Sequence, residues 1–131
     1  MLDDLTNLQA LLKDSTLLAT RGYIAGEWCD GENGQTFPVY NPARGDVITD
    51  VADISRTQTA EAISIAEKAQ KLWASRPAKE RSNLLRNWYN LMMENQEDLA
   101  TILTAEQGKP IEEAKGEITY GASFIEFFAE E

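Results

Sequence analysis

The residues of this chain best suited to phosphate chemistry are Gly108 and Lys109, in the stretch AEQGKPIEEAKGEI. A Gly-Lys pair closes the Walker-type phosphate loop, which also needs a glycine five residues before it and a serine or threonine after it. Here those two positions hold Leu103 and Pro110. The residues before Gly108 are typical of a helix, whereas the loop follows a strand. The stretch is therefore predicted to turn a corner between two helices.

Cys29 is the single cysteine of the chain, which contains no histidine. Thiol–imidazole and serine–histidine catalytic pairs and histidine-bound zinc are therefore excluded within this chain. We interpret Cys29 as a structural or incidental thiol rather than a nucleophile, since no histidine is available to activate it and Asp30 follows it. A lone cysteine also makes no internal disulfide, which fits a reducing compartment.

Several glutamates near the C-terminus could form a carboxylate pair or a metal site: Glu112, Glu113, Glu117 and Glu126. Carboxylates four residues apart lie on one helical face. A solvated acidic face with ion pairs to Lys109 and Lys115 is the favoured interpretation, since such pairs are common on helix surfaces.

Size and charge set further bounds. A chain of 131 residues is long enough for one domain, and its net charge of -10 repels nucleic acid and anionic membranes. No basic, apolar leader opens the sequence, and no apolar run approaches the ~18 residues of a membrane span. We expect a soluble, cytoplasmic protein with no nucleic-acid or membrane partner.

The first half of the chain is predicted to contain one helix and a small sheet. Residues 1–20 form an N-terminal helical arm, with Leu5, Leu8 and Leu12 at helical spacing. Residues 21–51 form an antiparallel meander of about three strands, in which Asn33-Gly34 suits a tight hairpin turn.

Four helices follow. Ser55 and Gln58 have the spacing of a capping box, and Asn95 with Asp98 is predicted to cap the third helix. Gly108 ends that helix and Pro110 begins the fourth. The fold class is thus an α+β fragment: an N-terminal helix, a small antiparallel meander and four α-helices.

Aromatic residues occupy the apolar faces of these helices. Trp73, Trp88 and Tyr89 are predicted to pack in the core. The last helix is apolar on nearly every side because of a second group of residues: Phe124, Ile125, Phe127 and Phe128. A helix of that kind requires burial on all sides, and no capping signal follows it, so we expect a chain cut within an element.

Five motifs occur in the order and spacing found in one family: YIAGEW, FPVYNPARGDVI, LRNWYNLMMENQEDLA, EQGKP and EAKGEITYGASFIEFFAEE. From about Tyr23 to its end, the chain resembles the N-terminal segment of the aldehyde dehydrogenase superfamily. The last three motifs are most similar to bacterial NAD(P)-dependent succinate-semialdehyde dehydrogenases. Residues 1–20 carry no motif of the family.

The resemblance implies that residues 21–131 are an incomplete N-terminal part of the family's α/β cofactor-binding domain. In the family a cysteine forms a thiohemiacetal, hydride passes to NAD or NADP, and a glutamate activates water while an asparagine helps hold the oxyanion. Those residues and the cofactor cradle lie downstream of Glu131. No residue here is therefore assigned a catalytic, cofactor-binding or metal role, and Cys29 is not in the catalytic context.

The resemblance leaves one alternative open. Some family members hold a monovalent cation near positions matching the Val39 carbonyl and Glu106, although a surface acid at the helix end is the favoured interpretation of Glu106.

The resemblance implies that the chain is the N-terminal fragment of an NAD(P)-dependent dehydrogenase that, at full length, oxidises succinate semialdehyde to succinate. We expect the isolated chain to be inactive. Its partners would be the remainder of the dehydrogenase chain and, at full length, a homotetramer or homodimer. The alternative is a free-standing helical interaction module.

Overall fold

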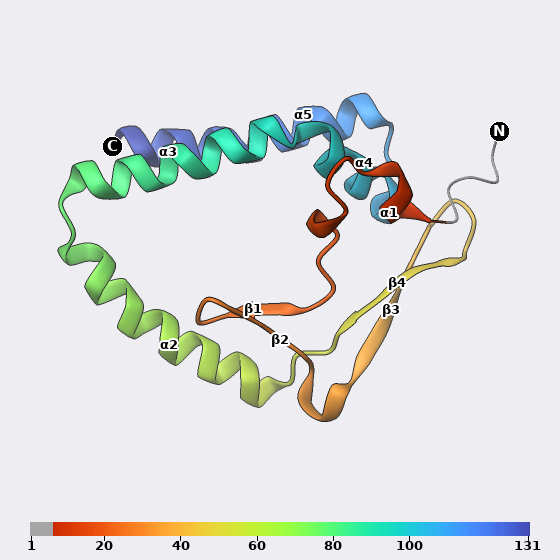
Figure 1. The fold of residues 1–131 in the computed structure, drawn as a ribbon, viewed down its shortest axis with the longest axis horizontal. Coiled ribbons are helices and arrows are strands. Elements are labelled where there is room, and N and C mark those ends of the chain that lie inside the picture. The colour runs from red at the N-terminus through yellow and green to blue at the C-terminus, as the bar shows by residue number, and fades with distance from the viewer. Residues whose placement is uncertain (1–6) are drawn as a thin grey trace. The chain divides into compact units, whose positions relative to one another are not determined.

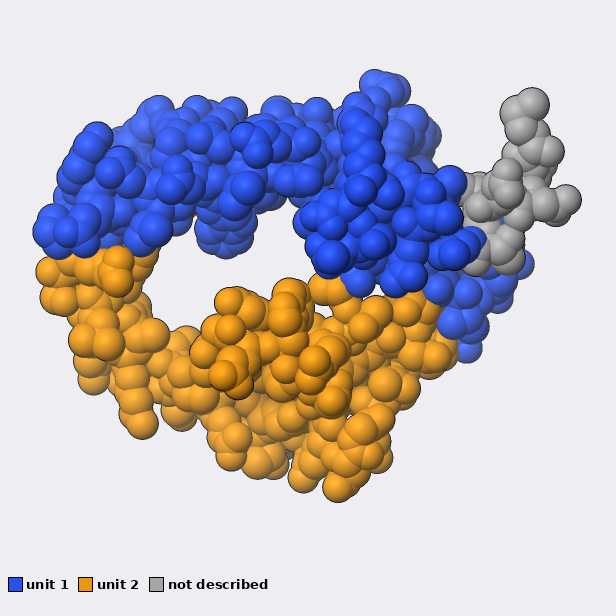
Figure 2. All heavy atoms as spheres, viewed as in Figure 1, with its two compact units in different colours: residues 1–18, 40–48, 77–131 blue, residues 19–39, 49–76 orange. Residues whose placement is uncertain are grey.

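The computed structural model describes residues 7–131, which form two compact units. Unit 1 includes the described residues up to 18 together with 40–48 and 77–131, and unit 2 consists of 19–39 and 49–76 (Figure 2). The chain combines helices with two small strand pairs, which confirms the predicted α+β class (Figure 1).

The strands of the chain form two separate pairs. Strand β1 (Gly22–Ile24) is antiparallel to β2 (Glu27–Cys29), with Tyr23 opposite Trp28. Strand β3 (Thr36–Tyr40) pairs with β4 (Val47–Ala52). The prediction of a single three-stranded meander is wrong in this respect. The difference arises at Ala25-Gly26, where positive φ angles of 57° and 84° reverse the chain within GYIAGEW. This turn pairs β1 with β2 in a strand pair of their own.

Asn33 and Gly34 do adopt the predicted positive φ angles, 57° and 72°. They lie in a 3₁₀ turn (Glu32–Gly34) that joins β2 to β3, two strands that do not pair with each other. The residue type therefore predicted the local backbone correctly but not the strands that it connects.

Unit 2 is held together around Gly31 and helix α2 (Arg56–Ser75). The predicted capping box of Ser55 and Gln58 is present, and Gln58 extends it by accepting from the Glu32 N–H at 3.0 Å and donating to the Asp30 carbonyl at 2.9 Å. Gly31 is buried, and a Cβ there would lie 2.3 Å from the Gln35 carbonyl oxygen. Only glycine permits that approach of backbone to backbone.

Unit 1 is built on three helices: α3 (Ala78–Glu94), α4 (Gln96–Gln107) and α5 (Ile111–Glu130). Helix α5 packs along both of the others, and α3 and α5 run side by side (Figure 1). The residues of α5 at this contact are small, since its buried positions are Ala114, Ala122 and Ala129. Alanines let helix axes approach closely.

The N-terminal arm differs from the expected helix. Helix α1 (Leu8–Leu11) is a single turn, followed by a 3₁₀ turn (Ser15–Leu17), and Leu2 and Leu5 lie outside the described residues. The N–H groups of Lys13 and Asp14 donate to the Asp98 carboxylate at 3.0 and 2.8 Å, so they do not continue α1.

Asp98 therefore has a different role from the predicted one. It was expected to cap α4 with Asn95, but the Asn95 side chain makes no capping bond and donates to the Leu91 carbonyl at 2.8 Å. The buried Asp98 carboxylate instead holds a segment 84 and 85 residues away in the chain. Hydrogen bonds from Asp14 and then Lys13 lower the pKa of Asp98 below its ordinary value.

Replacing Asp98 by asparagine should lower the melting temperature at neutral pH, because an amide offers one acceptor oxygen to two N–H donors. A lowered folded-state pKa means that the carboxylate's stabilisation is present above the unfolded pKa, about 4, and is lost as pH falls through the folded value. Circular-dichroism melts across this range should show the gap between Asp98→Asn and the parent closing on acidification. Asp50→Asn, at an exposed position, is the control, and a gap independent of pH would contradict the assignment.

Candidate functional site

The corner between α4 and α5 is where the sequence suggested phosphate chemistry. Gly108 has a φ of 86° and donates its N–H to the Thr104 carbonyl at 2.9 Å, which ends α4 as predicted. Helix α5 then begins at Ile111, after Pro110. A helix precedes the corner, and Glu112 and Glu113 occupy the first turn of α5. Their charges repel an anion at that helix end, so the corner is no phosphate cradle.

The turn between β3 and β4 packs against this corner. The Asn41 side-chain oxygen accepts from the N–H groups of Ala43 and Arg44 at 2.9 and 3.3 Å, and Pro42 lies so near Gly108 that a Cβ there would be 3.0 Å from Pro42 Cγ. The Arg44 guanidinium makes two hydrogen bonds to the Asp46 carboxylate, at 2.8 and 2.7 Å. This pairing lowers the pKa of Asp46, chiefly through the side-chain hydrogen bond.

Between the turn and the corner lies a pocket of about 230 Å³ within unit 1. Its walls combine apolar side chains, including Leu8, Ile48 and Ile111, with the polar Asn41 and Thr104. Among the described residues, Thr104 Oγ1 is a buried side-chain oxygen without a hydrogen-bond partner. The walls also include the Arg44–Asp46 ion pair. The Thr104 hydroxyl has no base within hydrogen-bond distance, so nothing in the described residues activates it as a nucleophile.

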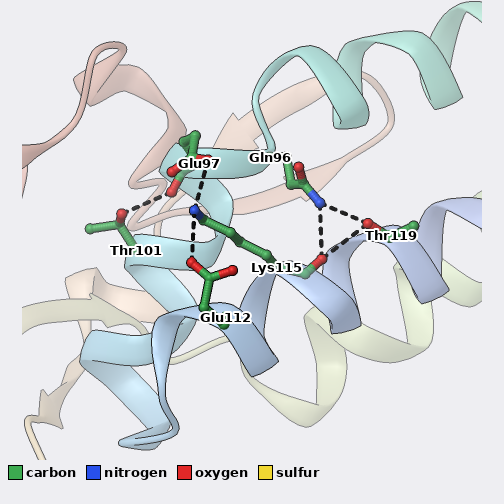
Figure 3. A network of polar contacts seen from close by, with 6 residues as sticks. All are labelled: Gln96, Glu97, Thr101, Glu112, Lys115 and Thr119. Carbon is green, nitrogen blue, oxygen red and sulfur yellow. Dashed lines mark hydrogen bonds and ion pairs between the residues drawn. The ribbon is translucent and has the colours of Figure 1, made fainter.

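A second polar cluster joins the first turns of α4 and α5 (Figure 3). Lys115 Nζ lies 2.9 Å from a Glu97 carboxylate oxygen and 3.1 Å from one of Glu112. The Gln96 amide donates to the Lys115 carbonyl at 3.1 Å and to the Thr119 hydroxyl at 2.7 Å. Hydrogen bonds to Glu97 and then Glu112 raise the pKa of Lys115 above its ordinary value. Its ammonium thus stays charged and serves as a structural link.

Two more glutamates of the predicted group, Glu117 and Glu126, are also ion-paired. Glu117 pairs with Lys109, and Glu126 and Glu130 pair with Arg86 at 2.6 and 2.7 Å. The interpretation of this acidic group as an ion-paired surface fits these contacts. Within residues 7–131, no group of three or more histidine, cysteine, aspartate or glutamate side chains is arranged to hold a metal ion.

The other candidate residues do not line the pocket. Cys29 is half-buried in β2, and its thiol donates to the Gly22 carbonyl at 3.4 Å. Glu106, in the last turn of α4, is exposed, although partial desolvation of its carboxyl raises its pKa. Val39 belongs to unit 2 and Glu106 to unit 1, and the cation hypothesis for them stays untested.

The predicted core position of Trp88 is wrong, because 56% of its surface is exposed. Trp73 and Tyr89 are half-buried, and the Arg86 guanidinium lies 5.4 Å from the centre of the Tyr89 ring. The apolar stripe of α3 is wider than the strip that α5 covers. Periodicity shows which face of a helix is apolar, but it does not show how much polypeptide is present to cover that face.

Sequence reasoning missed two polar residues that join distant segments, Asp98 and Arg86. The position of Asp98 in α4 suits a local cap, and that local role is the one the sequence predicts. Arg86 was not singled out, although a cation inside the apolar run LLRNWYNLMM is itself a signal. A charge within an apolar stripe usually has a partner across the packing interface.

Comparison with known proteins identifies the family of this chain. Residues 28–131 match the model of the aldehyde dehydrogenase family, and the chain belongs to that family. This confirms the resemblance drawn from the five motifs.

Individual relatives within the family include semialdehyde dehydrogenases. The chain is 56% identical over 120 residues to the glutarate-semialdehyde dehydrogenase of Pseudomonas putida and 52% identical to the NADP-dependent succinate-semialdehyde dehydrogenase of Escherichia coli. In both cases the match covers 92% of this chain and 25% of the relative. A crystal structure of an E. coli NADP-dependent enzyme superimposes with a TM-score of 0.88 at 52% identity, over 91% of this chain and 25% of that one. The chain thus spans about a quarter of the length of these relatives.

The corner offers a stability test. Gly108→Ala should reduce the free energy of unfolding by about 1–2 kcal/mol, because alanine is strained at this φ and its methyl group meets Pro42. Gly116→Ala is the matched control inside α5, where an added Cβ meets nothing within 4 Å. It should raise stability by about 0.5–1 kcal/mol. Urea denaturation measures both, and equal effects of the two substitutions would contradict the left-handed corner.

Proposed function

We propose that this chain is the N-terminal part of the cofactor-binding domain of an NAD(P)-dependent semialdehyde dehydrogenase. The observation that carries the proposal is the agreement in backbone, with a TM-score of 0.88 at 52% identity to an NADP-dependent enzyme. The relatives named for glutarate and succinate semialdehyde point to a short aldehyde that carries a carboxylate at its other end. Succinate semialdehyde, oxidised to succinate, is the substrate we favour for the full-length enzyme.

In this proposal the chain contributes structure rather than chemistry. The buried Thr104 hydroxyl has no hydrogen-bond partner, the Asp46 carboxylate is paired with Arg44, and the Cys29 thiol donates to a backbone carbonyl. The nucleophile, the base that activates water and the cradle for NAD or NADP would come from the part of the fold that this chain does not span. The choice between NAD and NADP would be made there too.

The partners and location follow from the same proposal. The chain would function within a longer dehydrogenase chain that assembles as a homotetramer or homodimer in the cytoplasm. Among residues 7–131, no helix is long and apolar enough to cross a bilayer.

The proposal predicts that the purified chain has no dehydrogenase activity. Absorbance at the NADH and NADPH wavelength should not rise when it is mixed with succinate or glutarate semialdehyde and either NAD+ or NADP+. The E. coli succinate-semialdehyde dehydrogenase is the positive control. Turnover by the chain alone, proportional to its concentration, would contradict the proposed division of labour.

A further inference from the structure

The outward side of α5 carries four aromatic residues, which we name the aromatic face: Tyr120, Phe124, Phe127 and Phe128. They follow one another at spacings of four, three and one, so they share one side of the helix. Their exposed fractions are 67%, 50%, 55% and 63%. The opposite side of α5 is the alanine side that packs against α3 and α4. The helix is therefore apolar on both sides but covered on only one.

The aromatic face exposes a large apolar area to solvent. An aromatic side chain contributes about 150–250 Å², so four that are half exposed or more present on the order of 400 Å². That is the size of the largest apolar patch on a typical monomer, and such patches often bind something. The helix has no charged residue from Ile118 to Ile125, so no cation or carboxylate interrupts the middle of the face.

The rings already pack against one another rather than scattering into solvent. Tyr120 and Phe124 make an edge-to-face contact with centres 4.9 Å apart, and Phe127 and Phe128 make another at 5.3 Å. Gly116 lies one turn before Tyr120, and a Cβ there would meet nothing within 4 Å. A glycine inside a helix weakens it, so its presence beside the rings suits a partner whose backbone approaches closely.

A second copy of this chain is a poor occupant for the face. Glu113 and Glu117 lie at its N-terminal end, and the one basic residue of α5, Lys115, is engaged with Glu97 and Glu112. An antiparallel pair of identical faces would place these carboxylates against rings. A parallel pair would place them against each other. The net charge of -10 on each copy adds a general repulsion.

The superposition provides a better occupant. The E. coli NADP-dependent enzyme contains the same fold as one quarter of its chain, so three quarters of that chain is available to cover the surfaces of this quarter. We propose that the aromatic face of α5 is an interior contact surface, covered by the remaining part of a semialdehyde dehydrogenase fold. This inference rests on the proposed function and adds to it the surface through which the chain joins that fold.

A full-length chimera tests the proposed function and the proposed contact surface separately. The quarter of the E. coli succinate-semialdehyde dehydrogenase that this chain matches is replaced by the chain itself. Three versions of the chimera are made: unchanged, Phe127→Ser with Phe128→Ser, and Glu112→Ser. The same substitutions are made in the isolated chain. Glu112 lies on α5 away from the aromatic face and is the matched control, because its side chain is exposed apart from the contact with Lys115.

The unchanged chimera should oxidise succinate semialdehyde and should bind little of the dye ANS, which reports exposed apolar surface. The double phenylalanine variant should lower the chimera's melting temperature by on the order of 10 °C. The same variant should leave the helical content and melting of the isolated chain nearly unchanged and reduce its ANS binding, since both rings are exposed there. Glu112→Ser should have equally small effects in both settings.

Three outcomes would overturn either the proposed function or the proposed contact surface. An inactive unchanged chimera contradicts the proposed function. An active chimera whose melting ignores the double phenylalanine variant contradicts the contact surface while leaving the proposed function in place. A discrete dimer of the isolated chain in sedimentation velocity, abolished by Phe127→Ser with Phe128→Ser, assigns the face to a second copy and overturns the proposal.

Discussion

The packing of α5 against α3 and α4 is the contact on which unit 1 depends. Its buried side consists of alanines at 114, 122 and 129, with at most 4% of their surface exposed. Among the described residues, no large side chain is completely buried. The interior of this unit therefore rests on close helix approach rather than on interlocking bulky groups, and each alanine removes comparatively little apolar area from water.

Polar contacts compensate for this thin interior by fixing the ends of the helices. Lys115 joins α5 to α4 near their first turns, and Arg86 joins α3 to the far end of α5. Asp98 attaches the N-terminal arm to α4 through two backbone N–H groups. Ion pairs at exposed positions contribute little individually, whereas the buried Asp98 carboxylate satisfies two donors that would otherwise lack partners.

The large exposed apolar surface of the helices links the fold to the proposed function. Helix α2 has no buried residue, and Trp88 on α3 and the rings of α5 are largely exposed. Relatives with the same backbone contain about three times as much additional chain. A scaffold that contributes helix surfaces to a larger enzyme would have this distribution of apolar groups, and its own pocket would not need catalytic groups.

Local chemistry made much of this structure predictable from the sequence. The capping box at Ser55, the left-handed Gly108 and the start of α5 after Pro110 all follow from interactions within a few residues. The order of five motifs identified the family for the same reason, since motif spacing is a property of the sequence itself.

Tertiary structure alone decided the rest. The turn at Ala25-Gly26 divided an expected meander into two strand pairs, and Asp98 left its expected cap to bind Lys13 and Asp14. Trp88 lies exposed because covering an apolar stripe requires a partner element, and the stripe itself does not specify one. Propensity and periodicity act over a few residues, whereas these outcomes depend on which distant segments meet and on how much chain is present to meet them.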